Sequence, residues 1–293
     1  MNNFLDWWQH LPSRIDPVLL SLGHLKIHWY GLMYILAFAV VYLLIRYRVR
    51  TESTDYDMDL VERFFTWAII GVLVGGRLGY VLFYNAGYYL AHPLEIVLPF
   101  SAGNGGVQYT GISGMSYHGG MLGVAIAFVL FARKYHVNFF RFTDLIVPAI
   151  PLGFMFGRIG CFINGMLYGR PTEVPWGMYF PMDSSGLLRH PSQLYEALFE
   201  GLVLFVILWP LRKKRFSRNA MAAFYLIGYG FFRFVIEFFR QPDPHLGEVV
   251  WTLTTGQLLS AGMVVAGSVL VWSTGRSVGI SMAPAGETSG KVH

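Results

Sequence analysis

Three arginines lie inside long apolar stretches of the sequence, where a charged side chain is unexpected. They are Arg77, Arg158 and Arg233, whereas the other 19 of the 22 lysines and arginines fall in more polar stretches or near the chain ends. An arginine deep in a membrane helix costs at least ~2.5–3.5 kcal/mol on insertion scales. Its presence there therefore indicates a function.

The residues around Arg158 favour a phosphate site. Gly157 and Gly160 allow a close backbone approach and an open pocket beside the guanidinium. The guanidinium fork suits bidentate hydrogen bonds to phosphate. A phosphate at this depth would belong to the head group of a membrane lipid. The alternative is a glycine motif for helix packing, with an arginine that reaches toward the interface.

Arg233 shares one helical face with Tyr229 and Glu237, because the three are spaced i, i+4 and i+8. Arg233 and Glu237 can pair within the helix, which lowers the cost of burying both. This face either binds a substrate or holds helices together.

His118 follows Ser116 and Tyr117 and precedes a pair of glycines. The titration range of histidine suits a general base. A histidine at an interface can also be a simple hydrogen-bonding residue, and both interpretations stay open. Cys161, the single cysteine, has no adjacent base and is interpreted as a packing residue.

The elements that carry these residues are predicted membrane helices. The chain of 293 residues is 54% hydrophobic and 13% charged, about half the usual charged fraction of a soluble protein. Apolar runs of ~18 residues or more indicate membrane spans. We therefore expect an all-α integral membrane protein with about seven spans, at Ile27–Ile45, Phe64–Tyr84, Met115–Ala132, Thr143–Gly165, Gln193–Leu211, Ala220–Phe239 and Gly256–Trp272.

Lysines and arginines predict the orientation of the spans, since cytoplasmic loops carry more of them. Fourteen fall on one side, including Arg46, Arg48, Arg50 and Arg63 of one loop, and five on the other. We expect the N-terminus outside and the C-terminus inside. Counted at ~1.5 Å per residue, seven polar groups then share the outer half of the membrane: Tyr30, Arg77, His118, Arg158, Glu196, Glu200 and Arg233.

The remaining segments complete the expected layout. We expect residues 1–293 to form one transmembrane domain, with loops on the outer side at 85–114 and 166–192 and a cytoplasmic tail, expected to be disordered, at 273–293. The histidines are scattered, and metal-ligand spacing and nucleotide-binding motifs are absent. We expect no metal and no cofactor. The net charge of +5 follows from the basic loops and requires no nucleic acid.

The sequence resembles the prolipoprotein diacylglyceryl transferases of bacterial inner membranes over nearly the whole chain. The likeness lies in several blocks in order: His28–Tyr34, Gly75–Tyr80, Tyr117–Gly120, Gly157–Gly160, Phe162–Gly165, Arg189–Glu196, and Gly228 through Arg233 and Glu237 to Asp243. Two positions depart from the family pattern. Cys161 stands where the family usually has Asn, and Met166 where it usually has Glu.

The resemblance implies a reaction and a set of site residues. Such enzymes move the diacylglyceryl group of phosphatidylglycerol onto the lipobox cysteine of a preprolipoprotein signal peptide, forming a thioether and releasing glycerol phosphate. Arg158, Arg233 and His118 would be catalytic, with the active site toward the periplasm. The substrates, including the lipid, would contact Tyr30, Asn164, Gly169, Tyr229 and Glu237, together with Arg158. Arg77, the remaining arginine of the apolar runs, is expected to shape the lipid pocket with Tyr30.

Three other interpretations are weighed against transfer. A small transporter also uses intramembrane charges, but it predicts repeated halves and polar residues in the inner leaflet, which the sequence lacks. A catalytically silent relative that binds lipid or lipoprotein is kept open by Met166. An intramembrane serine protease is disfavoured because Ser116 and His118 are too close in sequence and no nucleophile elbow is present.

Overall fold

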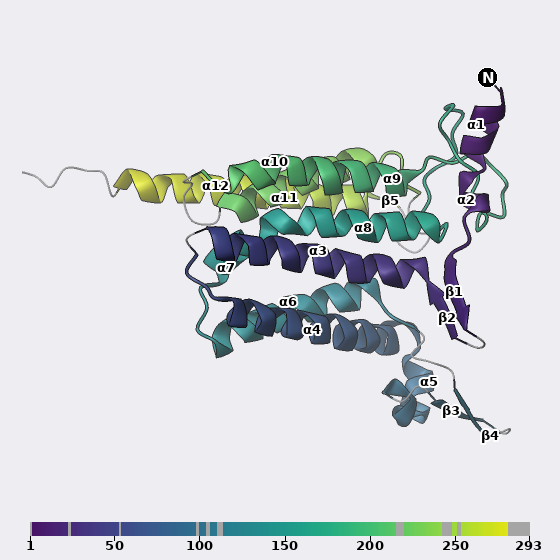
Figure 1. The fold of residues 1–293 in the computed structure, drawn as a ribbon, viewed down its shortest axis with the longest axis horizontal. Coiled ribbons are helices and arrows are strands. Elements are labelled where there is room, and N and C mark those ends of the chain that lie inside the picture. Colours follow the sequence, from purple (N-terminus) through teal and green to yellow (C-terminus); the bar gives the residue numbers. More distant parts are fainter. Residues whose placement is uncertain are drawn as a thin grey trace, which may run out of the picture. The chain divides into compact units, whose positions relative to one another are not determined.

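The structure, a computed structural model, describes residues 2–22, 25–52, 54–97, 100–103, 106–109, 114–214, 220–241, 248–250 and 253–280. A helical segment covers each of the seven apolar runs (Figure 1). Each of the first three runs is covered by a single helix, namely α3 (Trp29–Thr51), α4 (Met58–Tyr84) and α6 (Tyr117–Lys134). The others are α7 (Phe139–Ile146) with α8 (Ile150–Ile163), α9 (Ser192–Glu196) with η3 (Ala197–Val203) and α10 (Leu204–Leu211), α11 (Ala220–Ile236) and α12 (Thr255–Ile280).

Five of these segments are long and apolar enough to cross a membrane by length and composition: α3, α4, α7–α8, α9–α10 and α12. Of the other two, α11 is apolar but has only 17 residues. Helix α6 has 18 residues and carries polar ends, with His118 near its start and Arg133 and Lys134 at its end. The chain is therefore a mostly helical, multi-pass membrane protein, and the expected number of seven spans stays a prediction.

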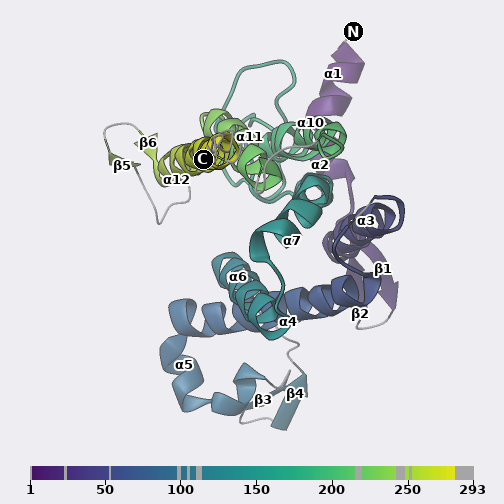
Figure 2. The same cartoon turned by 90° about the vertical axis from the view of Figure 1, so that its left-hand side faces the viewer.

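The chain divides into two compact units, and each is described by itself. The first comprises residues Met1–Arg48 and Thr143–His293, and the second comprises Val49–Phe142. The expectation of a single domain stays a prediction. Within the first unit, α8 packs on η3 and α11 packs on α12. Figure 2 looks nearly along the axes of α10, α11 and α12, which lie side by side.

The fourth run is broken, because Pro148 interrupts it. A 3₁₀ turn, η2 (Val147–Ala149), joins α7 to α8. Proline has no N–H, so the carbonyl of Asp144 loses its helical partner. Arg48 Nη1 donates to the Asp144 carbonyl at 2.9 Å and to that of Leu145 at 2.5 Å. Arg48 was expected to be a loop charge, and that assignment is wrong: its side chain is buried on α3, where its guanidinium donates to the Asp144 carbonyl that Pro148 deprives of a helical N–H.

In the second unit, glycines bring α4 and α6 into close contact. Gly71, Gly75 and Gly79 of α4 face Gly119 and Gly123 of α6. A Cβ on Gly79 would lie 2.6 Å from the Gly119 Cα, and one on Gly71 would lie 2.8 Å from the Gly123 carbonyl oxygen. Small residues at every fourth position are typical of membrane helices that pack backbone against backbone.

Short elements occupy the connections between the long helices. Helix α5 (Ala86–Ala91), the 3₁₀ turn η1 (Pro93–Ile96) and a hairpin of β3 (Phe100–Gly103) and β4 (Gly106–Tyr109) lie in the expected loop 85–114. Two more antiparallel hairpins pair β1 (Val18–Leu22) with β2 (Leu25–His28), and β5 (Glu248–Val250) with β6 (Leu253–Thr254). Helix α12 continues to Ile280, so the start of the expected tail is helical. Residues 281–293 lie outside the described residues.

The loop after α8 has its own small core. Phe162, Met178 and Phe180 form it, with α1 (Asn2–Gln9) and α2 (Leu11–Arg14) packed against it through Trp8 and Leu11. A buried ion pair ties the loop together, because Arg189 Nε lies 2.6 Å from Asp183 Oδ2. These hydrogen bonds from Arg189 hold the pKa of Asp183 at about 2.

The glycine contact between α4 and α6 predicts that Gly123→Ala lowers the thermal stability of the detergent-purified protein. Overpacking a close contact costs about 1–3 kcal/mol. Gly262→Ala on α12 is the matched control, since nothing lies within 4 Å of a Cβ at Gly262. Equal melting temperatures for the two variants would show that the close approach is not required.

Candidate active site

Within the first unit, six charged side chains meet where α8 and α11 end and α9 begins. Three are arginines and three are glutamates, so their formal charges balance. Each lies largely out of solvent, with arginine side chains at most 14% exposed and glutamate side chains at most 6% exposed. The six, called the charge cluster here, are Arg158, Glu196, Glu200, Arg233, Glu237 and Arg240.

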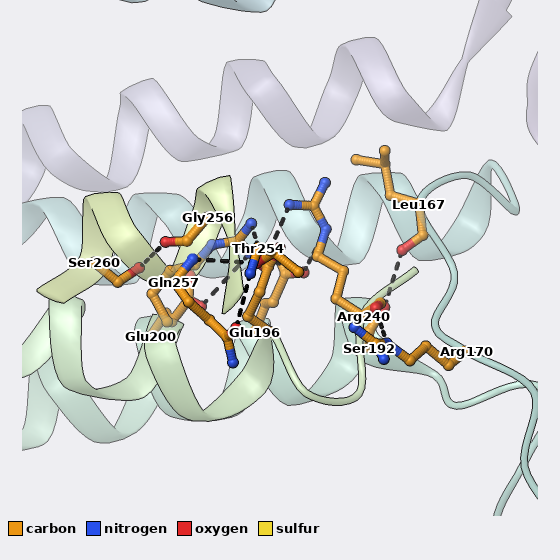
Figure 3. A network of polar contacts seen from close by, with 12 residues as sticks. Leu167, Arg170, Ser192, Glu196, Glu200, Arg240, Thr254, Gly256, Gln257 and Ser260 are labelled. Carbon is orange, nitrogen blue, oxygen red and sulfur yellow. Dashed lines mark hydrogen bonds and ion pairs between the residues drawn. The ribbon is translucent and has the colours of Figure 1, made fainter. Parts of the chain in front are cut away.

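Glu196 lies between the three arginines. Its Oε2 is 2.7 Å from Arg158 Nε, and its Oε1 is 3.5 Å from Arg233 Nη1 and 3.7 Å from Arg240 Nε. Its side chain has no exposed surface. Figure 3 shows Glu196 in the middle of the network, with Arg240 on one side and Glu200 on the other. One carboxylate thus connects α8, α9 and the end of α11.

The other two glutamates flank Arg233. Glu237 Oε2 lies 2.9 Å from Arg233 Nη2 and 3.9 Å from Arg240 Nη1, which confirms the predicted pairing of Arg233 with Glu237. Glu200 Oε1 is 4.0 Å from Arg233 Nη1. Arg233 therefore contacts all three carboxylates of the charge cluster.

Burying this many charges indicates function rather than stability. Well-packed hydrophobic residues are often as stabilising as a buried ion network, or more so. Arg158 approaches Glu196 most closely through Nε, and Glu196 is the single carboxylate with which it forms an ion pair among the described residues. A guanidinium has five N–H donors, so a single carboxylate partner leaves donors with which Arg158 can bind an anion.

Glycines allow the elements of the charge cluster to approach one another. A Cβ on Gly201 of η3 would lie 2.6 Å from the Met155 Cβ, one turn before Arg158 on α8. The segment that contains Gly201 is a π-helix, a form that is frequent at functional sites. Gly169, expected at the site, is required for a different approach: its N–H donates to the His190 carbonyl at 2.8 Å, and a Cβ there would collide with the Phe239 carbonyl.

Aromatic rings lie beside the arginines. The Phe154 ring is 4.8 Å from the Arg158 guanidinium carbon, a cation–π distance. Tyr229 meets Phe154 edge-on, with ring centroids 5.7 Å apart. Tyr30 packs on α8 at Gly160, where a Cβ would lie 3.4 Å from the tyrosine ring. The first unit thus brings Tyr30 and Tyr229 to the helices that carry the charge cluster.

Asn164 ends α8, and its buried Oδ1 has no hydrogen-bond partner among the described residues. The two positions that differ from the resembled family lie close to it in sequence. Cys161 is a buried free thiol. The Met166 carbonyl accepts a hydrogen bond of 2.6 Å from Gln193 Nε2, so the backbone here is held through α9.

Arg77 and His118 belong to the second unit. Arg77 donates to the backbone carbonyls of Glu95 at 2.6 Å and Ile96 at 2.8 Å, and its guanidinium lies over the Tyr89 ring. It therefore holds the 3₁₀ turn η1 within the loop 85–114. His118 is exposed in the first turn of α6. The roles expected for these two residues stay predictions.

The sequence prediction missed part of the charge cluster. Arg240 was expected at the outer surface as a loop charge, which is wrong: its side chain is 14% exposed and contacts Glu196. Its spacing from Arg233 and Glu237, i+7 and i+3, places all three on one face and could have identified it. Glu196 and Glu200 were expected at this depth but were not assigned to the site.

Glu196→Gln is predicted to destabilise the protein, because three buried arginines would then face two carboxylates. Removing one partner of a buried ion network typically costs roughly 3–5 kcal/mol. The measurement is thermal unfolding in detergent, with Glu173→Gln as the control, since Glu173 is exposed. If the two variants unfold at the same temperature, the charge cluster does not depend on Glu196.

Comparison with known proteins identifies the family of this chain. The sequence model of the prolipoprotein diacylglyceryl transferase family matches residues 17–273. The phosphatidylglycerol–prolipoprotein diacylglyceryl transferase of Chlorobaculum tepidum is 52% identical over 278 residues, 94% of this chain and 96% of that protein. Those of Bordetella avium and Nitrosomonas europaea are 50% and 47% identical, covering 90% and 88% of this chain and 96% and 90% of their own lengths. The chain therefore belongs to the prolipoprotein diacylglyceryl transferase family.

Proposed function

We propose that this protein transfers the diacylglyceryl group of phosphatidylglycerol to the lipobox cysteine thiol of preprolipoproteins. The observation that carries the proposal is the charge cluster in a member of this family. It contains three arginines at the common end of several apolar helices, and Arg158 forms an ion pair with a single carboxylate of the described residues, that of Glu196. The relatives are named for phosphatidylglycerol and prolipoprotein. The proposal adds that the lipobox cysteine of the prolipoprotein is the acceptor.

The transfer is a substitution at carbon. The cysteine sulfur, as a thiolate, bonds to the glyceryl carbon that carries the phosphate. The bond from that carbon to the phosphate oxygen breaks, and its electron pair leaves on glycerol phosphate. Arg158 binds the phosphate and offsets the charge that develops on the leaving oxygen, as preorganised cations do. No covalent intermediate with the enzyme is required.

Arg233 has a second part in this mechanism. Glu237 and Tyr229 orient it, and it either shares the phosphate with Arg158 or stabilises the incoming thiolate. The unpartnered Oδ1 of Asn164 is an acceptor available to a hydroxyl of the substrate. Tyr30 of the first unit and Arg77 of the second are each proposed to contact the lipid. Arg77 also donates to the loop carbonyls of Glu95 and Ile96.

His118 is the proposed proton acceptor for the cysteine thiol. Neutral imidazole accepts a proton near neutral pH, which matches the task. His118 is solvent-exposed in the first turn of α6. The proton that leaves the sulfur would then rest on the imidazole until it is lost to solvent.

The proposed setting is the bacterial inner membrane. Seven spans, with the N-terminus outside and the C-terminus inside, place the charge cluster toward the periplasm. The distribution of lysine and arginine supports this orientation, since the loop 212–219 alone carries five. The substrate lipid would then enter laterally from the outer leaflet.

Reconstituted protein with phosphatidylglycerol and a lipobox peptide is expected to form the diacylglyceryl thioether, as measured by mass spectrometry. Arg158→Ala and Arg233→Ala should each lower the rate by roughly 10²–10³-fold, the usual loss when one charge-stabilising group is removed. Arg158→Lys should retain part of the activity, because lysine keeps the positive charge. It should not retain all of it, because lysine lacks the guanidinium fork.

Arg141→Ala is the control for these variants, because its ion pair with Asp55 is solvent-exposed. Unchanged product formation by the Ala variants at 158 and 233 would contradict the mechanism. A wild type without product, together with a large gain for Met166→Glu, would instead identify the chain as a silent relative.

His118→Gln is expected to lower the transfer rate at neutral pH by about 10²-fold, the lower range for loss of a general base. The remaining rate should rise as pH increases, because the thiol then ionises without help. His92→Gln, in the loop 85–114, is the matched control. A pH profile identical to that of the wild type would assign the proton to another acceptor.

A further inference from the structure

The start of α12 touches the charge cluster at Glu237. Thr254 Oγ1 donates to Glu237 Oε1 at 3.1 Å, and both side chains are buried. The other carboxylate oxygen, Oε2, faces Arg233 and Arg240. The two oxygens of Glu237 therefore have separate partners, one on α12 and one among the arginines. Figure 3 shows Thr254, Gly256 and Gln257 grouped beside the cluster.

The position of Thr254 is fixed by α12 itself. The Gln257 N–H donates to Thr254 Oγ1 at 3.2 Å, and the Thr254 N–H donates to Gln257 Oε1 at 3.0 Å. This reciprocal pair is a capping box at the helix N-terminus. A hydroxyl can accept hydrogen bonds and has one proton to donate. The Thr254 hydroxyl accepts from the Gln257 N–H and gives its one proton to Glu237.

Gly256 leaves room for the carboxylate. A Cβ at this position would lie 2.6 Å from Glu237 Oε1 and 2.7 Å from its carboxyl carbon. The carboxylate thus sits directly on the first turn of α12, where the helix dipole favours a negative charge. Gly262 lies about two turns further along α12, and a Cβ placed there would have no atom within 4 Å. The requirement for glycine is therefore specific to the contact with Glu237.

We infer that Thr254 and Gly256 are positioning residues for the transfer reaction, which hold Glu237 so that its Oε2 orients Arg233 and Arg240. They do not touch the substrate, and their effect reaches the phosphate through the arginines. The inference rests on the proposed function. It adds a fourth helix to the site, because α12 contributes no charged residue to the cluster but fixes one of its carboxylates.

A purely structural cap makes a different prediction from a positioning residue. If Thr254 only began α12, its loss would lower the melting temperature and leave the turnover of folded protein unchanged. If it orients Glu237, turnover should fall in protein that is still folded, and a residue that keeps the hydroxyl should restore it.

The experiment compares Thr254→Val, Thr254→Ser, Gly256→Ala and Gly262→Ala in the same reconstituted transfer assay, with melting temperatures measured in parallel. Thr254→Val should lower kcat/KM roughly ten-fold, the size of one hydrogen bond to a charged group. Thr254→Ser should keep the wild-type rate. Gly256→Ala should also lower turnover, because the new methyl group displaces the carboxylate, whereas Gly262→Ala should not.

Two results would overturn the inference. One is wild-type turnover in both Thr254→Val and Gly256→Ala. The other is a loss in Thr254→Ser as large as in Thr254→Val. If Thr254→Val does not fold, the pair Gly256→Ala and Gly262→Ala decides, because both keep the hydroxyl. A wild type that makes no thioether refutes the proposed function instead, so the two failures are distinguishable.

Discussion

Glu196 has no solvent exposure and lies between Arg158, Arg233 and Arg240. Most of the site follows from this one contact. A carboxylate without water requires cations, and cations without water require carboxylates, so α8, α9 and the end of α11 must meet where they do. With three arginines and three glutamates, the formal charges of the cluster sum to zero before an anion arrives. Because Glu196 approaches Arg158 most closely at Nε, and a guanidinium has five N–H donors, Arg158 can bind a phosphate while it keeps the contact with Glu196.

Glycine supplies the close approaches that this contact requires. Gly201 lets η3 reach α8, Gly169 lets the loop after α8 reach the end of α11, and Gly256 lets α12 reach Glu237. In each case a methyl group would collide with a neighbouring atom. Within a membrane the hydrophobic effect contributes little to helix association. Close packing of the helix backbones therefore supplies much of the stabilisation. The site is therefore held by packing around it as well as by its own charges.

The sequence predicted the local parts of this arrangement and missed the long-range ones. The seven apolar runs and the Arg233–Glu237 pair were predictable, because both depend on spacing within one helix. The pairing of Arg158 with Glu196 depends on which faces of two helices meet, which spacing does not reveal. Arg240 was placed outside because Pro242 follows it closely and marks a helix end. Arg48 was taken for a loop charge because one of its acceptors, the Asp144 carbonyl, is freed only by the break at Pro148.

The most direct test of the account is where phosphatidylglycerol binds, determined by electron cryo-microscopy of the protein in nanodiscs containing that lipid. The account predicts the lipid phosphate within hydrogen-bonding distance of Arg158, ~2.7–2.9 Å from an Nη group, and beside Arg233 or Arg240. Glu196 should still hold the Nε of Arg158. A phosphate bound away from the charge cluster, with the arginines engaged only by the glutamates, would contradict it.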